Sequence, residues 1–324
     1  MSGDAIDFSI VSVNHNTCAL LVSCLTSIYR SRGEATFEIV VVDNNSSDES
    51  VAMVQSQFQN VRVIMNSENQ GFARASNQGI RIARGRYILL LNSDTEVFPD
   101  TFDQLKHFLE NVRFDSKIGI IGCKIVNSDN THQYSVGKFP TIWSTITGMF
   151  RSRPKRKYYL FGYDEPHEVD WVTGAFMLID RRVIYDAGLL DERYFMYYED
   201  VDYCLKAKKR GWKVFYYPKV RIIHKHPYGS KQNHDGERVM IEIRGSHLYY
   251  YRKNHSYVSF IILSFATIIF LLIKLFCLNT TLFLGKENRR DRERRVRLLL
   301  SSVWNTFREL NKKASTLLES QLSE

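Results

Sequence analysis

The sequence contains little that could cross-link the chain. Only five cysteines occur, an odd number, and no two of them have the Cys-x-x-Cys spacing of a metal or redox site. This pattern argues against a disulfide framework and against a zinc centre, and it predicts reduced thiols in a cytosolic compartment. Internal repeats and low-complexity tracts are also lacking. The N-terminus shows no basic stretch followed by an apolar core, so we expect no secretory signal.

The composition is that of a globular protein with an excess of positive charge. Hydrophobic residues make up 44% and charged residues 24% of the 324 positions, enough for one large or two small domains with a sizeable core. The net charge of +9 suggests an anionic partner. Nucleic acid, a phosphorylated substrate and lipid headgroups all meet that description.

Short apolar runs alternate with helical patterns through the first hundred residues. The runs are predicted strands, and polar residues follow them before the next helical pattern begins. This alternation indicates an α/β fold, with a parallel sheet covered by helices on both faces. The predicted strands cover residues 8–13, 37–42, 61–65 and 87–91, followed by 118–125, 176–179, 214–217 and 220–223.

Three of these strands end in polar side chains, Asn14, Asp43 and Asp94. The carboxyl ends of parallel strands meet at one edge of the sheet, where open α/β folds bind ligands, so we expect the three to share a site. The Asp43 carboxylate can accept the N3–H of a uracil or thymine base, a donor that cytosine lacks. The alternative is that Asp43 only stabilises a turn.

Two interpretations stay open for Asp94, which follows a run of five large apolar residues. It can hold a divalent cation, since magnesium and manganese favour hard oxygen ligands, or it can cap the next helix. The helix expected at Gly71 would offer unpaired amides and a positive dipole end to a diphosphate. The alternative there is a loop that the glycine makes possible.

Carboxylates and histidines gather in the later part of the chain. Residues 199–202 (Glu-Asp-Val-Asp) open a predicted helix with three carboxylates, more than capping requires, although acidic side chains favour the first turn of any helix. The Gly174-Ala175 pair would let a ligand approach the backbone closely. His224 and His226 follow a predicted strand, where a lone histidine is usually only a hydrogen-bonding residue.

The ordered set of motifs resembles the inverting family-2 glycosyltransferases, in particular their rhamnosyltransferase branch, over roughly residues 6–230. The residues that carry the family resemblance are Val-Asp-Asn-Asn-Ser-Ser-Asp at 42–48, Asn-Gln-Gly-Phe-Ala-Arg-Ala-Ser-Asn at 69–77 and Leu-Leu-Asn-Ser-Asp-Thr at 90–95. Those that carry the branch resemblance are Thr-Gly-Ala at 173–175, Tyr-Glu-Asp-Val-Asp-Tyr at 198–203 and Gly-Trp at 211–212.

This resemblance implies an A-type glycosyltransferase fold that uses a nucleotide-diphosphate sugar and Mg²⁺ or Mn²⁺. By motif position, Asp200 would be the catalytic base, and Asp94 with His224 would bind the metal. The expected nucleotide-binding residues are Asn14, Asp43, Asn69, Gly71 and Asn77, and the expected sugar- or acceptor-binding residues are Trp171, Gly174, Ala175 and Glu199.

Two departures from the family pattern affect the metal site. The usual Asp-x-Asp is Asn92-Ser93-Asp94, which leaves one carboxylate for the cation. The His-x-x-Gly-x-Ser of many relatives is stretched to residues 224–230, so His224 and His226 compete for the ligand role.

The last third of the chain is expected to be helical and membrane-associating. We predict a catalytic domain over 1–233 and a helical region over 234–324. Residues 257–278 form an almost continuous apolar run, about 33 Å as a helix, with basic residues at both ends. Charge on both flanks favours a re-entrant or in-plane segment over a single span, and a buried dimer helix is the soluble alternative. The tail over 286–322 reads as a basic amphipathic helix.

Taken together, the sequence predicts a transferase that moves a sugar, preferably L-rhamnose from dTDP-rhamnose, to a glycan acceptor linked to polyprenyl diphosphate. Such an enzyme would work in polysaccharide or O-antigen assembly at the cytoplasmic face of a membrane, with no nucleic-acid partner. Another UDP- or dTDP-sugar is the first alternative. A glycoside hydrolase using Asp200 and Asp202 and a non-catalytic nucleotide-binding scaffold are the others.

Overall fold

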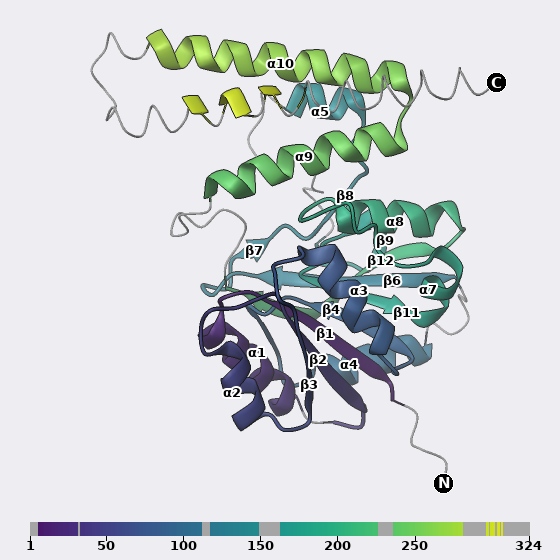
Figure 1. Cartoon of the computed structure of the whole chain (residues 1–324). Coiled ribbons are helices and arrows are strands. Elements are labelled where there is room, and N and C mark those ends of the chain that lie inside the picture. The colour runs from purple at the N-terminus through teal and green to yellow at the C-terminus, as the bar shows by residue number, and fades with distance from the viewer. Residues whose placement is uncertain are drawn as a thin grey trace, which may run out of the picture. The chain divides into compact units, whose positions relative to one another are not determined.

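The computed structural model describes residues 6–31, 33–111, 117–148, 163–225 and 236–280, together with residues 296, 297, 299–301, 303, 304 and 306. The chain forms two compact units (Figure 1). Unit 1 comprises residues 1–139 and 157–230, and unit 2 comprises residues 140–156 and 231–324.

The expected single catalytic domain over 1–233 therefore needs a correction. Helix α5 (Ile142–Gly148) belongs to unit 2, where the Thr145 hydroxyl hydrogen-bonds the Tyr251 hydroxyl on α9 (Gly236–Asn254). Such a pairing joins segments about a hundred residues apart, so the local sequence pattern does not reveal it.

Unit 1 is built on a large sheet with the strand order β3-β2-β1-β4-β11-β6-β12-β5. Its strands are β1 (Phe8–Asn14), β2 (Phe37–Asp43), β3 (Val61–Met65), β4 (Tyr87–Leu91), β5 (Thr95–Val97), β6 (Ile118–Val126), β11 (Phe176–Asp180) and β12 (Lys213–His224). The short strands β7 (His132–Gln133) and β9 (His167–Val169) pair with β6 and β12, and β8 (Val136–Gly137) pairs with β10 (Trp171–Val172).

The sheet is mixed, whereas the sequence pattern predicted a parallel one. Strands β1 to β4 are parallel to one another, but β11 runs antiparallel to both β4 and β6. Every residue of β11 is buried. A strand covered on both faces reads as the same apolar run in either direction, so its orientation could not be read from the sequence.

The two strands predicted at 214–217 and 220–223 are one strand, β12. Its pairing with β6 is irregular between Tyr217 and Arg221, around Pro218. Proline has no N–H to donate to the ladder, and this interrupts the pairing without ending the strand. The continuation matters for function because it carries the end of β12 to His224.

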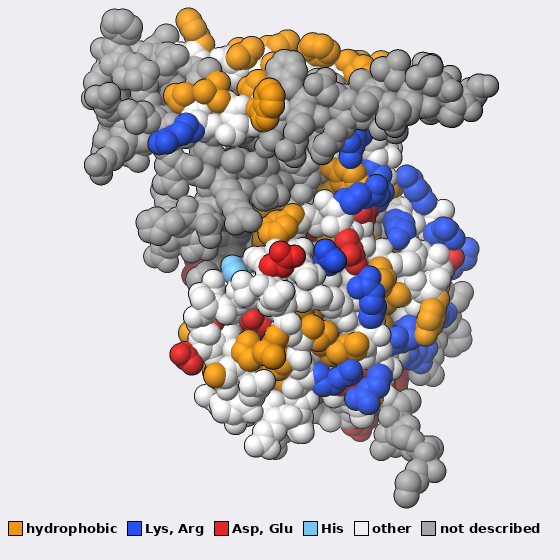
Figure 2. Space-filling view, in the orientation of Figure 1, with side chains coloured by type: hydrophobic (Ala, Val, Ile, Leu, Met, Phe, Trp, Pro, Cys, Tyr) orange, Lys and Arg blue, Asp and Glu red, His pale blue; other side chains and the backbone are white. Residues whose placement is uncertain are grey.

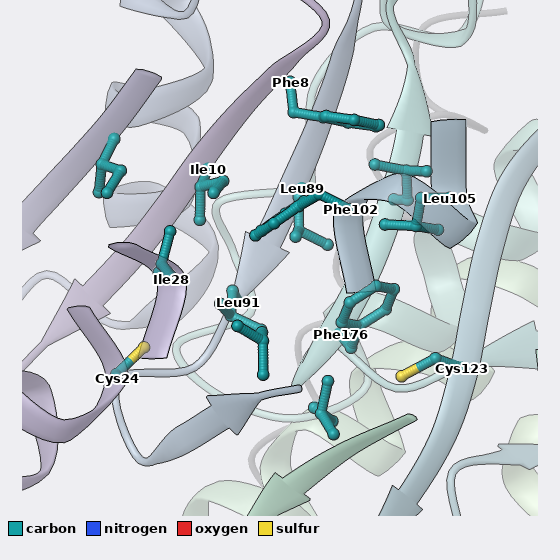
Figure 3. Packing of buried hydrophobic residues seen from close by; sticks show 14 of the residues in the cluster. Phe8, Ile10, Cys24, Ile28, Leu89, Leu91, Phe102, Leu105, Cys123 and Phe176 are labelled. Carbon is teal, nitrogen blue, oxygen red and sulfur yellow. The ribbon is translucent and has the colours of Figure 1, made fainter. Parts of the chain in front are cut away.

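Helices cover both faces of the sheet, as predicted. One hydrophobic core lies on the face of α1 (Cys18–Arg30) and α4 (Thr101–Asn111), where Phe8 and Phe102 meet with ring centroids 5.7 Å apart (Figure 3). On the opposite face α3 (Phe72–Ile82) packs so closely on β1 that a Cβ at Gly79 would lie 2.3 Å from Val11. Among the residues of unit 1 that the structure describes, the remaining helices are α2 (Ser50–Gln57), α7 (Arg181–Ala187) and α8 (Glu199–Lys209).

Unit 2 contains α5, α9 and the long helix α10 (Tyr257–Thr280). One side of α10 is buried, and the other carries a row of large apolar side chains that are 49% to 69% exposed. This row is visible along the top of Figure 2, and it consists of Val258, Ile262, Phe265, Ile269, Leu272, Ile273 and Phe276.

None of the helices in the described part of the chain combines the length and the apolar character needed to cross a membrane. Most of the predicted amphipathic tail at 286–322 lies outside the described residues.

Candidate active site

The tips of β1 and β2 lie side by side and bury a carboxylate. Asn14 is paired in register with Asp43 and donates from Nδ2 to Asp43 Oδ1 at 2.9 Å. Ser46 donates to both oxygens, from its backbone N–H at 2.9 Å and from its hydroxyl at 2.6 Å. An ionised carboxylate has about four acceptor positions, so Asp43 keeps one for an N–H donor such as the N3–H of a base.

The predicted nucleotide contact of Asn14 needs a correction. This side chain is fully buried, its amide nitrogen is held by Asp43 and Ser46, and its Oδ1 accepts from Thr17 at 2.6 Å. The hydrogen bonds of Asn14 are all made within the protein, so in this structure it orients the Asp43 carboxylate and has no amide atom left for a ligand.

Gly71 precedes α3 with a φ of +80°, in the left-handed region. A Cβ at this position would lie 2.4 Å from the carbonyl oxygen of Phe195, so the glycine is required by space as well as by conformation. Asn69 supports the turn, because its Oδ1 accepts from the Gly71 N–H at 3.0 Å and from Asn44 Nδ2 at 3.2 Å.

The prediction that this helix start offers unpaired amides to a diphosphate is wrong for its first two positions. The Gly71 N–H is bound by Asn69, and the Phe72 N–H donates to the Phe195 carbonyl at 2.7 Å. The acceptor on Phe195 comes from a segment more than a hundred residues away, so the sequence pattern alone could not show that these donors are satisfied.

Substitution of Gly71 tests this account. Gly71→Ala is expected to lower the free energy of unfolding by roughly 1–3 kcal/mol, because the new Cβ meets Phe195 and a positive φ strains an L-residue. The measurement is urea unfolding followed by circular dichroism. Gly245→Ala is the matched control, since a Cβ there meets nothing within 4 Å and α9 should gain about 0.5–1 kcal/mol. Equal midpoints for Gly71→Ala and wild type would contradict the steric argument.

Two further residues predicted to contact a ligand, Asn77 and Trp171, are buried and make their hydrogen bonds within the protein. Asn77 is fully buried on α3; it donates to the Leu190 carbonyl at 2.9 Å and accepts from the Leu190 N–H at 3.1 Å, so it ties α3 to a loop. Trp171 is 1% exposed, and its indole N–H donates to the Lys138 carbonyl at 2.9 Å. Trp171 was predicted to bind the sugar or the acceptor, but in the structure its side chain is part of the core.

Asp94 and His224, the predicted metal ligands, lie together although 130 positions separate them in the chain. Strand β5 pairs with the end of β12, with Thr95 opposite His224, and the Lys225 N–H donates to the Asp94 carbonyl at 2.9 Å. This pairing places Asp94 Oδ1 3.1 Å from His224 Nε2. His226, the competing ligand in the sequence, lies outside the described residues.

The donor set at this pair fits a divalent cation that completes its shell from a substrate. Asp94 Oδ1 and His224 Nε2 bring one oxygen and one nitrogen ligand atom to within 3.1 Å of each other. No cluster of three or more acidic, histidine or cysteine side chains suited to a metal occurs among the described residues. Magnesium is typically held by one or two carboxylates plus substrate phosphates, and Asp94 would supply one such carboxylate.

Asp200 is joined to the same edge of the sheet through the turn at 173–175. The Gly174 N–H donates to Asp200 Oδ2 at 3.1 Å, and the Ala175 carbonyl accepts from the Asn92 N–H at 3.1 Å. Gly174 is confined by Phe72, whose ring carbons would lie 3.2 Å from an added Cβ. The turn therefore connects the α8 start, the β4 tip and the α3 start.

The three carboxylates at the start of α8 differ in access. Glu199 and Asp202 are 5% and 2% exposed, and Asp202 accepts from the Tyr194 hydroxyl at 3.2 Å, whereas Asp200 is partly open. Burial of Glu199 does not support its predicted acceptor contact. Burial of Asp202 removes the carboxylate pair on which the glycoside hydrolase alternative depended.

Two features of the site had no signal in the sequence. Tyr197 and Tyr198, just before α8, have φ of 68° and 69°, and each left-handed residue costs about 1–2 kcal/mol. Gln133 on β7 brings its Oε1 to 2.6 Å from His224 Nδ1. A lone glutamine on a two-residue strand has no pattern by which it could have been recognised.

Comparison with known proteins decides the family. Residues 9–187 match the family described as "Glycosyl transferase family 2", which is more than half of the chain. The chain belongs to this family. The match ends before Asp200 and His224, so it does not test the roles predicted for those two residues.

This glycosyltransferase is also similar to curated relatives. It is 26% identical over 249 residues to the low-salt glycan biosynthesis hexosyltransferase Agl10 of Haloferax volcanii, covering 75% of each chain. It is 27% identical to an N-acetylglucosaminyl-diphospho-decaprenol L-rhamnosyltransferase of Mycobacterium tuberculosis, covering 59% of this chain and 67% of the relative. It is 30% identical to the rhamnosyltransferase WbbL of Escherichia coli K12 over 44% of this chain and 54% of the relative.

Solved structures agree on the A-type glycosyltransferase fold. GalNAc-T7, crystallised with UDP, GalNAc and Mn²⁺, has a TM-score of 0.56 at 18% identity, covering 78% of this chain and 51% of that chain. The mannosyltransferase PcManGT of Pyrobaculum calidifontis, in complex with GDP-Man and Mn²⁺, has a TM-score of 0.54 at 13% identity, covering 94% and 87%. At these identities the similarity concerns the fold alone.

Proposed function

We propose that this family-2 glycosyltransferase moves L-rhamnose from dTDP-rhamnose to a hydroxyl group of a glycan acceptor, with inversion at the anomeric carbon. The observation that carries the proposal is the 173–175 turn, which donates from the Gly174 N–H to the Asp200 carboxylate and accepts, on the Ala175 carbonyl, from the Asn92 N–H next to Asp94. Two of the relatives described above are named rhamnosyltransferases, which favours rhamnose as the sugar. Another UDP- or dTDP-sugar is the second candidate, because Asp43 would bind uracil and thymine alike.

In this mechanism the chain's own residues bind the donor and move one proton. Asp43 accepts the base N3–H, and Asp200 takes the proton from the acceptor hydroxyl as its oxygen attacks the anomeric carbon. The bond from that carbon to the diphosphate oxygen breaks on the opposite face. Asp94 and His224 would hold Mg²⁺ or Mn²⁺, which when bound neutralises charge on the departing diphosphate. Mn²⁺ accompanies both neighbouring structures named above.

A donor panel tests the proposal. dTDP-rhamnose, UDP-glucose, UDP-GlcNAc and GDP-mannose are each incubated with the full chain, with and without Mn²⁺, and release of the nucleoside diphosphate is measured. The highest metal-dependent release is expected with dTDP-rhamnose. CDP is the matched control in thermal shift: dTDP should raise the melting temperature and CDP should not, because cytosine has no N3–H for Asp43. Turnover with GDP-mannose alone would overturn the donor assignment.

We further propose that the acceptor is linked to a polyprenyl diphosphate and that unit 2 binds the surface of the membrane that contains it. The name of the Mycobacterium tuberculosis relative specifies a diphospho-decaprenol acceptor. The exposed apolar row on α10 supports the membrane proposal, since such faces mark membrane or protein contacts. Arg252 and Lys253 precede this helix in sequence, and Arg297 follows it, so the flanks suit anionic headgroups at a cytoplasmic face.

Charge substitutions on α10 test the membrane proposal. Phe265→Glu combined with Ile269→Glu should abolish co-sedimentation with anionic liposomes, because both side chains belong to the exposed row and burying a carboxylate in the acyl region is costly. Tyr185→Glu is the control, since Tyr185 is an exposed large side chain of unit 1. If the double variant binds liposomes as well as wild type does, the exposed row on α10 is not the membrane-binding surface. If the wild-type protein does not bind liposomes and sediments as a dimer, the exposed row on α10 would instead be the contact with a second copy of the chain.

A further inference from the structure

A polar chain runs from the β6–β7 hairpin to the proposed metal ligand His224. At its far end Asp129 Oδ1 accepts from the Thr131 hydroxyl and, at 3.0 Å, from the Thr131 N–H. The Thr131 hydroxyl oxygen in turn lies 2.8 Å from Asn127 Nδ2. Asn127 Oδ1 accepts from Gln133 Nε2 at 2.9 Å, and Gln133 Oε1 lies 2.6 Å from His224 Nδ1.

The direction of this chain is set by its first member. Asp129 is exposed and acts only as an acceptor, and the Thr131 donors lower its pKa, so the single hydroxyl hydrogen of Thr131 points to it. The Thr131 oxygen can then only accept, which directs the Asn127 amide group toward it. Asn127 therefore turns its carbonyl oxygen to Gln133.

The same logic fixes the orientation of Gln133 and of the imidazole. Since Gln133 Nε2 donates to Asn127, its Oε1 faces His224 and can only accept, so His224 Nδ1 carries the hydrogen. The hydrogen bond made by one ring nitrogen decides which form the other takes. In neutral His224 the Nε2 lone pair is consequently left facing Asp94 Oδ1 across 3.1 Å, and Asn92 Nδ2 lies 3.5 Å from the same ring nitrogen. With the lone pair on Nε2, the imidazole and the Asp94 carboxylate can both be ligands of one cation.

We propose that Gln133 is a positioning residue for the cation site: by accepting the Nδ1–H of His224, it holds the imidazole in the tautomer whose Nε2 lone pair faces Asp94. Gln133 itself makes no contact with the cation. The backbone of Gln133 is held beside His224, because Gln133 pairs with Ile125 on β6, and β6 pairs with β12. The inference rests on the metal-dependent function proposed above.

Substitutions at Gln133 test the inference on the full chain. Gln133→Leu removes the acceptor, whereas Gln133→Glu keeps it, because a carboxylate can still accept the Nδ1–H. Mn²⁺ affinity is measured by calorimetry in the presence of dTDP. The tautomer is read from ¹⁵N chemical shifts of labelled histidine, with the His224 signals assigned by their loss in His224→Gln. Melting temperatures show that each variant is folded.

The expected result is a Kd for Mn²⁺ roughly 10–100-fold higher in Gln133→Leu, the usual loss for a residue that orients a metal-bound histidine, and near wild type in Gln133→Glu. The His224 spectrum should shift from a single Nδ1–H form to a mixture only in Gln133→Leu. Unchanged affinity and spectra in Gln133→Leu would overturn the inference and leave the proposed function standing. Wild type that binds no Mn²⁺ with dTDP would overturn the metal-dependent function and the inference with it.

Discussion

Asp200→Asn is expected to lower kcat by roughly 10²–10⁴, the range typical of a lost general base. The change keeps the shape of the side chain and removes its ability to take a proton. Donor binding should change little, since Asp43, Asp94 and His224 carry those contacts in the proposed site. The measurements are kcat for nucleotide release and the donor Kd.

The geometry around Asp200 predicts a second effect of the same substitution. Asp200 accepts from the Val201 N–H at 2.8 Å and from the Gly174 N–H at 3.1 Å, one donor on each oxygen. An asparagine must turn its NH₂ group toward one of them, so the variant should also lose about 1–3 kcal/mol of unfolding free energy. A melting curve separates this loss from the fall in kcat.

Asp202→Asn is the matched control on the same turn of α8. Asp202 is buried and accepts from the Tyr194 hydroxyl, an interaction that an asparagine oxygen can retain. We expect wild-type kcat and a loss of about 0.3–1 kcal/mol of stability from the weaker dipole interaction. An inactive Asp202→Asn beside an active Asp200→Asn would show that the base is assigned to the wrong carboxylate.

Asp94→Ala is expected to reduce metal-dependent turnover by at least roughly 10²-fold, comparable to removing a group that stabilises transition-state charge. The usual first carboxylate of this motif is Asn92 here, and an amide cannot replace the lost charge. Turnover should be measured across a Mn²⁺ titration, because a weakened site would recover at high metal and a lost site would not.

Glu96→Gln is the control for Asp94→Ala. Glu96 lies two residues further along, on β5, and forms an ion pair with Lys225. Partly exposed pairs of this kind contribute little, roughly 0–1 kcal/mol, so turnover and the Mn²⁺ requirement should match wild type. Full activity of Asp94→Ala at ordinary Mn²⁺ concentrations would exclude Asp94 as a metal ligand.

The sequence by itself determined the α/β class, the strands that deliver Asn14, Asp43 and Asp94, and the family. These features depend on local patterns: apolar runs of strand length, the polar residues that follow them, and their order along the chain. Parallel strands end at the same edge, so the common edge of the β1, β2 and β4 tips follows from the pattern, whereas the strand order that makes them neighbours does not.

Only the tertiary structure decided what each of the remaining motif residues contacts. Asn77 and Trp171 occur at motif-like positions, yet hydrogen bonds to Leu190 and Lys138 make them structural. The Phe72 amide is occupied because the Phe195 carbonyl reaches it from a distant segment.

The direction of β11, the continuity of β12 past Pro218 and the pairing of Gln133 with His224 were likewise decided by tertiary structure. Each depends on which strand or side chain lies opposite in space. Burial and hydrogen-bond satisfaction are properties of such long-range neighbours, and a local sequence pattern does not contain them.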